Sequence, residues 1–197
     1  MWTFRTAIGS LSDPALLARY AEGDNAAARE LARRLLPRLM GVAQRMLSDV
    51  AEAEDVVQET MLRLWKIAPD WQEGEAQVST WAYRVAMNLC TDRLRKRRFV
   101  SDTPLDAMPD PADTSQDVAD RMQDDARVRA LHHAIADLPE RQRAAVVMRH
   151  FEGLSNPEIA AIMDIGVEAV ESLTSRGRRT LKQALADRRE ELGYGHG

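Results

Sequence analysis

The sequence predicts an all-α protein with two small helical domains joined by a flexible acidic linker. Apolar residues recur at helical spacing along most of the 197 residues, and no alternating strand pattern is present. Capping side chains and prolines stand where these helical patterns begin. One acidic stretch interrupts the patterns. It divides the chain into domain 1–98, linker 99–126 and domain 127–197.

The first two helices follow from their start signals. Ser12 is a capping residue, and Pro14 follows it in the first turn. Asn25 can cap a second helix, which we expect to bend near Pro37. One face of this second helix is apolar, which indicates that it is buried. The residues of this face are Ala28, Leu31, Leu35, Leu39, Val42 and Met46.

The third predicted helix, 51–66, has a polar side formed by Asp55, Gln58, Glu59 and Arg63. An acidic helix side is usually only solvated. In a domain that binds nucleic acid, however, such a side does not face the phosphates, so it is available to a protein partner. We expect the opposite side to face the core. It carries Val56, Met61, Leu64 and Trp65.

A loop at 69–77 leads to a fourth helix, which begins at Ser79 or Thr80 and ends in the basic run 93–98. We expect an apolar stripe of Trp81, Val85 and Leu89, with polar and aromatic side chains exposed beside it. Basic residues interleaved with aromatic rings suit single-stranded DNA, because bases stack on rings and phosphates contact cations. The candidate contacts are Trp71, Tyr83, Arg84, Asn88, Arg93 and Arg95.

The tryptophans have a second interpretation. For Trp65 and Trp81 we expect positions in the core. For Trp71, which lies in the loop, a core position and a DNA contact stay equally open. Asn88 carries an amide, which can read the edge of an unstacked base.

The negative charge of the chain is concentrated in one segment. Residues 101–125 hold eight aspartates and one arginine, a charge of −7, whereas the net charge of the whole chain is −4. The rest of the chain is therefore +3, which removes the apparent objection to nucleic-acid binding. The segment is poor in large apolar residues and contains three prolines, so we expect a flexible linker. An acidic spacer without a function of its own is the alternative.

The second domain has the pattern of a helix-turn-helix. A first stripe of Val128, Leu131, Ile135 and Leu138 precedes a helix that begins at Pro139 and ends at Gly153. Ser155 or Asn156 then caps a short helix, a break at 164–166 follows, and a last helix runs from Val167 to about Ala186. Two helices joined by a tight turn with a glycine place the second helix in the DNA major groove.

The last helix has a polar side opposite its apolar positions. Short polar side chains near its start can reach base edges, and arginines can bond guanine or phosphates. We expect Arg176 to contact a base or a phosphate, and the other basic residues to hold phosphates. A solvated amphipathic helix is the alternative. The candidate contacts are Glu168, Glu171, Ser172, Ser175, Arg176, Arg178 and Arg179.

Other functional classes find little support in the sequence. Cys90 is the single cysteine, which excludes a disulfide framework and suits the cytoplasm. No signal peptide is evident, and the apolar runs are too short for a membrane span. His132 and His133 are adjacent and point to different sides of a helix, so we expect no metal and no cofactor. No nucleophile–base pair or phosphate loop indicates an enzyme.

Two groups of segments resemble a known family. Stretches 55–65 and 79–88 resemble the second conserved region of extracytoplasmic-function (ECF) sigma factors of the sigma-70 family. Stretches 138–143, 152–160 and 170–172 resemble the fourth region. The resemblance covers nearly the whole chain, in order, with nothing for a third region between. Two matching groups at the right separation are more specific than either group alone.

This resemblance implies a subunit that brings core RNA polymerase to promoter DNA. The polar side of the third helix would bind the coiled coil of the largest polymerase subunit. The loop around Trp71 and the fourth helix would hold the melted −10 element, with one base flipped out. The last helix would read the −35 element, and the linker would run toward the polymerase active centre. An anti-sigma factor would bind such a protein and inhibit it.

The match departs from the family pattern at Glu171, where many relatives carry a basic residue, and at Leu173. Glu171 can accept a hydrogen bond from a cytosine amino group or be a solvated charge. A different function also stays open at this point. The chain could be an autonomous regulator that uses only its helix-turn-helix, although the acidic linker and the net negative charge disfavour it.

Overall fold

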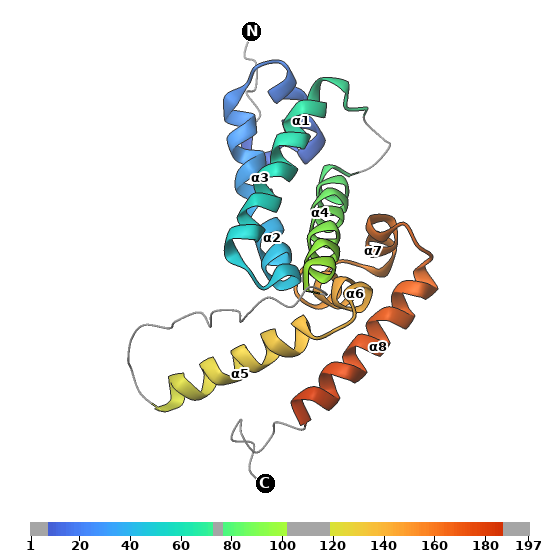
Figure 1. Ribbon diagram of the computed structural model, residues 1–197. Coiled ribbons are helices and arrows are strands. Elements are labelled where there is room, and N and C mark those ends of the chain that lie inside the picture. The colour runs from blue at the N-terminus through green and yellow to red at the C-terminus, as the bar shows by residue number, and fades with distance from the viewer. Residues whose placement is uncertain (1–7, 73–76, 102–118, 187–197) are drawn as a thin grey trace.

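The structure, a computed structural model, describes residues 8–72, 77–101 and 119–186 (Figure 1). These residues form eight α-helices and two short 3-10 helices, and they contain no strand. The prediction of an all-α fold is confirmed. The helices form an N-terminal unit, residues 8–101, and a C-terminal unit, residues 119–186.

Side-chain caps begin the first three helices of the N-terminal unit. Ser12 accepts a hydrogen bond from the Ala15 amide, and Asp49 does the same for Glu52. The prediction that Asn25 caps the second helix is wrong, because the carboxylate of Asp24 accepts from two amides of the first turn instead. The elements of this unit are η1 (Ile8–Ser10), α1 (Asp13–Ala21), α2 (Asn25–Leu47), α3 (Val50–Ile67), η2 (Ala68–Asp70) and α4 (Val78–Ser101).

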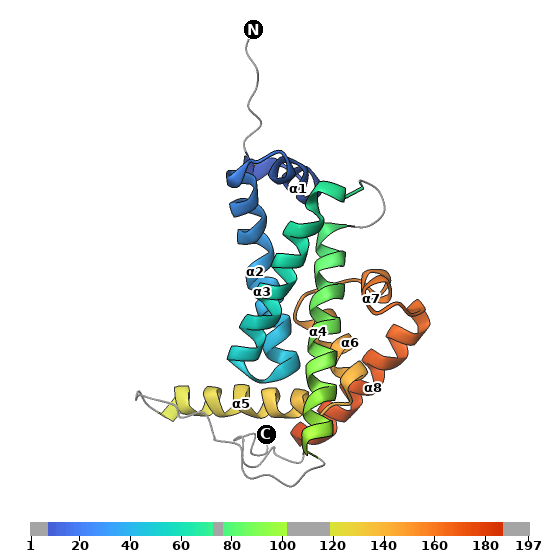
Figure 2. The same cartoon turned by 45° about the horizontal axis from the view of Figure 1, so that its top comes forward.

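Helices α2, α3 and α4 lie side by side and enclose the main core (Figures 1 and 2). Helix α4 begins one residue before Ser79, the earlier of the two predicted starts, and ends three residues later than predicted, since a started helix gains one hydrogen bond for each residue added. Its buried face also differs from the predicted stripe, because Trp81, Val85 and Leu89 are only half-buried. Between Val78 and Arg98, the buried residues of α4 are Val78, Ala82, Tyr83, Ala86, Met87 and Cys90.

The C-terminal unit contains the predicted helix-turn-helix. Ser155 and Glu158 form a reciprocal capping box at the start of its first helix, as expected from Ser155 followed by a proline. Asp164 has a φ of 52° and ends that helix before the tight turn. The helices of this unit are α5 (Ala119–Ala136), α6 (Glu140–His150), α7 (Asn156–Met163) and α8 (Val167–Ala186).

Gly177 is required where α8 crosses α6. A Cβ at this position would lie 2.5 Å from Cγ2 of Val146, which is buried. The absent side chain lets the two helices approach closely. Predicted apolar positions of α8 are confirmed, since Val170 and Gly177 are buried and Leu173, Thr174 and Leu181 are half-buried.

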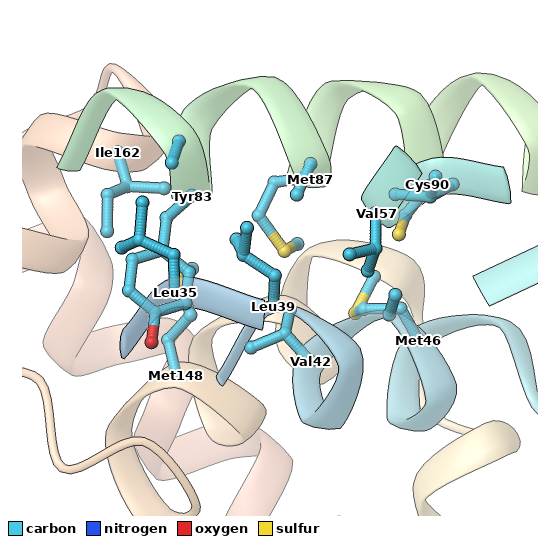
Figure 3. Packing of buried hydrophobic residues seen from close by; sticks show 14 of the residues in the cluster. Leu35, Leu39, Val42, Met46, Val57, Tyr83, Met87, Cys90, Met148 and Ile162 are labelled. Carbon is cyan, nitrogen blue, oxygen red and sulfur yellow. The ribbon is translucent and has the colours of Figure 1, made fainter. Parts of the chain in front are cut away.

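The two units pack against each other through α2 and α4 on one side and α6 and α7 on the other. Figure 3 shows Leu35 and Tyr83 of the N-terminal unit close to Met148 and Ile162 of the C-terminal unit. Helices α4 and α5 also extend into the predicted linker at both ends, to Ser101 and from Ala119. Residues 102–118 of that linker lie outside the described residues.

Candidate polymerase and nucleic-acid interfaces

The polar side of α3 faces solvent. Asp55 is the most open of its charged groups, with 68% of its side chain exposed, and its carboxylate lies 3.7 Å from Arg93 of α4. Arg63 donates to Glu59 one turn earlier at 2.7 Å. Gln58 is exposed between them. The structure therefore brings the four residues predicted for polymerase binding onto one accessible surface.

An apolar groove lies beside this polar side, between α2 and α3. Leu36 and Leu62 are 40% and 56% exposed, which is high for leucines of a small domain. Our sequence interpretation missed both residues, although an apolar residue on the polar side of an amphipathic helix is a usable signal. The groove encloses about 370 Å³ and is lined by Ala32, Leu36, Met40, Glu54, Val57, Gln58, Met61, Leu62 and Trp65.

The candidate −10 contacts on α4 differ in their exposure and in their hydrogen bonding. Asn88 is exposed, as predicted. Tyr83 was expected to be exposed but is only 2% exposed, because the C-terminal unit covers it. Its hydroxyl donates to the Glu152 carboxylate at 2.9 Å. Burial, and then the neighbouring charge of Glu152, raise the pKa of Tyr83 above its usual value. Arg84 is exposed, but its guanidinium donates to the carbonyl of Ala161 in α7.

Trp71 is half-buried, and its ring meets that of Trp81 edge to face at a centroid distance of 6.2 Å. Both rings pack against the main core. This geometry favours the core interpretation of Trp71 over the DNA-contact interpretation. Trp65 packs in a similar way on Tyr20, with ring centroids 4.6 Å apart.

The basic end of α4 is partly used to hold the N-terminal unit together. Arg93 donates to the carbonyl of Glu52, and Arg97 pairs with Glu52 at 2.8 Å and with Asp49 at 3.5 Å. Arg95 pairs with Asp92 one turn earlier and is more exposed. Of the two predicted DNA contacts in this run, Arg95 is therefore the more accessible, whereas Arg93 connects α4 to α3.

The polar side of α8 is open to solvent over its whole length. Arg176 is exposed, and its Nε donates to the carbonyl of Ser172, one turn earlier in the same helix, at 3.3 Å. Glu171 accepts from the side chain of Asn156 at 3.3 Å, which connects the two helices of the helix-turn-helix. All seven predicted −35 contacts are exposed: Glu168, Glu171, Ser172, Ser175, Arg176, Arg178 and Arg179.

Three further findings concern other kinds of site. Among the described residues, no group of histidine, cysteine and carboxylate side chains has the geometry of a metal site. Cys90 is buried, and burial raises the pKa of its thiol to about 12, so it is unreactive near neutral pH. None of the helices in the described ranges is both long and apolar enough to span a membrane.

Comparison with protein families agrees with the two units. The family model for Sigma-70 region 2 matches residues 31–100. The model for Sigma-70, region 4 matches residues 128–181. The first match contains α3, nearly all of α4 and most of α2, and the second contains α7 and most of α8.

Several curated relatives align over most of the chain. The ECF RNA polymerase sigma factor SigW of Bacillus subtilis is 32% identical over 84% of this chain and 92% of its own length. SigM of Mycobacterium tuberculosis is 33% identical over 88% of this chain and 85% of its own length.

Solved structures share the fold. CnrH, in complex with the cytosolic domain of CnrY, has a TM-score of 0.67 and is 26% identical, with 89% of this chain and 97% of CnrH covered. The sigma factor RpoE of Bartonella quintana, in complex with the anti-sigma factor NepR, has a TM-score of 0.62 and 23% identity, with 80% of this chain and 96% of RpoE covered. The chain therefore belongs to the ECF sigma factors of the sigma-70 family.

Proposed function

We propose that this chain binds core RNA polymerase and directs it to promoters without catalysing a reaction itself. In this proposal residues 1–98 bind the polymerase and the melted −10 element, residues 127–197 bind the −35 element, and 99–126 connect them. The observation that carries the proposal is that α8 exposes its polar side at the end of a helix-turn-helix, while the acidic side of α3 stays free for a protein partner.

The assignment of α8 to duplex DNA is supported by its charges. Arg176, Arg178, Arg179 and Lys182 are all exposed on one helix. A helix of this kind fits the major groove, with short side chains near its N-terminus at base edges and arginines at phosphates. The acidic side of α3 would be repelled by phosphates, so a protein surface is the better partner for it.

An anti-sigma protein is the second partner that we propose. The relative CnrH is bound by another polypeptide in its solved structure. In this chain, the apolar groove between α2 and α3 is an exposed surface that such a partner can cover. We expect the partner to compete with the polymerase, because Gln58 belongs both to the groove and to the polar side of α3. We place this activity in the cytoplasm, where transcription occurs.

The proposal is tested by run-off transcription with purified core polymerase on genomic fragments. Wild-type protein should yield discrete transcripts that core enzyme alone does not produce. Asp55→Asn combined with Glu59→Gln should weaken association with core enzyme, measured by co-sedimentation. Asn88→Ala should leave that association intact and reduce the opening of promoter DNA, measured by permanganate reactivity of unpaired thymines.

Three outcomes would contradict the assignments. Absence of association between wild-type protein and core enzyme would refute the proposed function. Sequence-specific binding to duplex DNA without any polymerase-dependent transcript would favour an autonomous regulator instead. Unchanged promoter opening by Asn88→Ala would remove Asn88 from the −10 site.

A further inference from the structure

Charged residues are unevenly distributed along α8. Its first half, residues 167–175, carries Glu168 and Glu171 and no basic residue. Its second half, residues 176–186, carries four basic residues and no acidic one. Phosphates therefore attract the second half and repel the first. When such a helix lies in the major groove, its basic half is held at the DNA backbone, and its acidic half faces the edges of the bases.

The stability of the helix accounts for only one of the two glutamates. Glu168 lies in the first turn of α8, where a carboxylate interacts favourably with the positive end of the helix dipole. Glu171 lies beyond the first turn, where this effect falls off. Its side chain is exposed on the polar side of α8. The position of Glu171 therefore calls for a different explanation.

Asn156 holds the carboxylate of Glu171. Its Nδ2 donates to Oε1 of Glu171 at 3.3 Å. Asn156 is the first residue of α7, whose start is fixed by the capping box of Ser155 and Glu158, and α7 packs against α8 (Figure 1). Because an asparagine is neutral, the bond orients the carboxylate without cancelling its charge. The carboxylate keeps further positions at which it can accept a hydrogen bond.

The chemistry of the major groove decides which base suits such a group. An ionised carboxylate only accepts hydrogen bonds. Guanine presents two acceptors and thymine presents an acceptor and a methyl group, so neither base can donate to it. Adenine presents the N6 donor directly beside the N7 acceptor, which repels a carboxylate. Cytosine presents the N4 amino donor alone, so it is the best partner for a carboxylate.

We propose that Glu171 determines specificity at the −35 site by accepting a hydrogen bond from the N4 amino group of a cytosine, and that Asn156 is the positioning residue for its carboxylate. This inference rests on the proposed function, which assigns α8 to the −35 element. The sequence left Glu171 open between a cytosine contact and a solvated charge. The bond from Asn156, 15 residues earlier, favours the contact because it fixes an orientation. We expect each other base at this position to be disfavoured roughly tenfold or more.

A purely structural role for the pair makes a different prediction. If the bond between Asn156 and Glu171 serves only to join α7 to α8, its loss should weaken binding to all DNA sequences by the same factor. If Glu171 reads a base, its replacement should change the base that is preferred. Base preference is therefore the quantity that distinguishes the two roles.

The test uses the full-length protein bound to core polymerase. A promoter that the wild type transcribes is randomised over its −35 element, bound fragments are recovered, and their base frequencies are compared with the input by sequencing. We expect the wild type to enrich cytosine at one position. Glu171→Lys replaces an acceptor by a donor and should enrich guanine there. Glu171→Gln, whose amide both donates and accepts, should enrich adenine.

Two further variants serve as a positioning test and a control. Asn156→Ala should still enrich cytosine, but more weakly, because the carboxylate is then free to rotate. An unchanged cytosine enrichment would show that Asn156 does not position it. Glu22→Lys makes the same charge change as Glu171→Lys at an exposed position of the N-terminal unit. It should keep the wild-type preference, which separates base reading from a general gain of positive charge.

The remaining outcomes separate this inference from the proposed function. A wild type without a cytosine preference would overturn the inference, and so would the wild-type preference in both Glu171 variants. If Glu171→Lys fails to fold by circular dichroism, Glu171→Gln decides alone, because its side chain has nearly the same shape as glutamate. Run-off transcription by the wild type on the unaltered promoter tests the proposed function. Absence of a transcript would refute that function and this inference with it, whereas an unchanged preference in active protein would refute this inference alone.

Discussion

The two helices that carry the candidate DNA contacts, α4 and α8, differ in how far those contacts are exposed. On α4, Tyr83 is buried and Arg84 is bonded to the other unit. On α8, every candidate contact is exposed, and only Val170 and Gly177 are buried. The difference shows that residues predicted from spacing to contact DNA can instead lie in a packed interface.

The largest expected effect concerns apolar residues that pack beneath the two candidate DNA surfaces, one in each unit. Leu64 of α3 is fully buried, whereas Leu181 of α8 is half-buried. Leu64→Ala should lower the free energy of unfolding by about 2–5 kcal/mol, because it leaves a cavity in a packed core. Leu181→Ala should lower the free energy of unfolding by clearly less than Leu64→Ala does. Urea denaturation followed by circular dichroism measures both, and equal losses would contradict the view that α8 is the less embedded helix.

A smaller effect is expected for the DNA surface of α8. Arg178→Ala combined with Arg179→Ala should weaken binding of the free protein to a −35 duplex by about 10- to 100-fold, since each arginine removed is a lost phosphate contact. The slope of log affinity against log salt should also fall by about one for each contact. Fluorescence anisotropy over a salt series measures both quantities. Gln183→Ala on the same helix is the control, and an unchanged salt slope would show that these arginines do not touch DNA.

The third prediction concerns the position where α8 crosses α6. Gly177→Ala should lower the free energy of unfolding by about 1–3 kcal/mol, because the added Cβ would be 2.5 Å from the buried side chain of Val146. The better helix propensity of alanine offsets part of this loss, by about 1 kcal/mol. Adding Val146→Ala provides space, so the two changes together should cost less than their sum. Additive losses in a double-mutant cycle would contradict the assigned clash.

The smallest effect concerns a surface network of the N-terminal unit. Glu30 accepts hydrogen bonds from Arg33 and Arg34, which lower its pKa from 4.5 to about 2. A carboxyl whose pKa is lowered by folding stabilises the folded state at every pH above its ordinary pKa. This stabilisation is lost as the pH falls from about 4.5 toward 2. Glu30→Gln should therefore be slightly less stable than wild type at pH 7, and the difference should shrink through that window. A difference in thermal unfolding that is as large at pH 2.5 as at pH 7 would exclude this origin.

Local signals predicted most of the helices. Ser12 and Pro14 mark the start of α1, and Ser155 with Glu158 marks the start of α7, because caps act over three or four residues. The exposed side of α8 also followed from spacing alone. The error at Asn25 was of one residue, since Asp24 and Asn25 have equally good capping side chains and only the backbone geometry decides between them.

The site was predicted less completely than the fold. Periodicity correctly placed the polar side of α3 and of α8 on the surface, but it did not find the apolar groove beside Leu62. It also assigned Tyr83 to the exposed side of α4, because the sequence interpretation took Trp81, Val85 and Leu89 as the apolar stripe, whereas Tyr83 shares the buried face with Met87 and Cys90. Packing between units depends on residues far apart in the chain, which spacing cannot relate.

The amino-acid order by itself determined the helical class, the two-part division and the polar character of α3 and α8, because these depend on local hydrogen bonding and on the periodicity of apolar residues. Only the tertiary structure decided which polar residues are accessible. Glu152, Arg38 and Tyr83 come from three separate segments, and they meet only through the burial of the Glu152 carboxylate between the two units. That burial is a property of the assembled fold and has no counterpart in any one stretch of the chain.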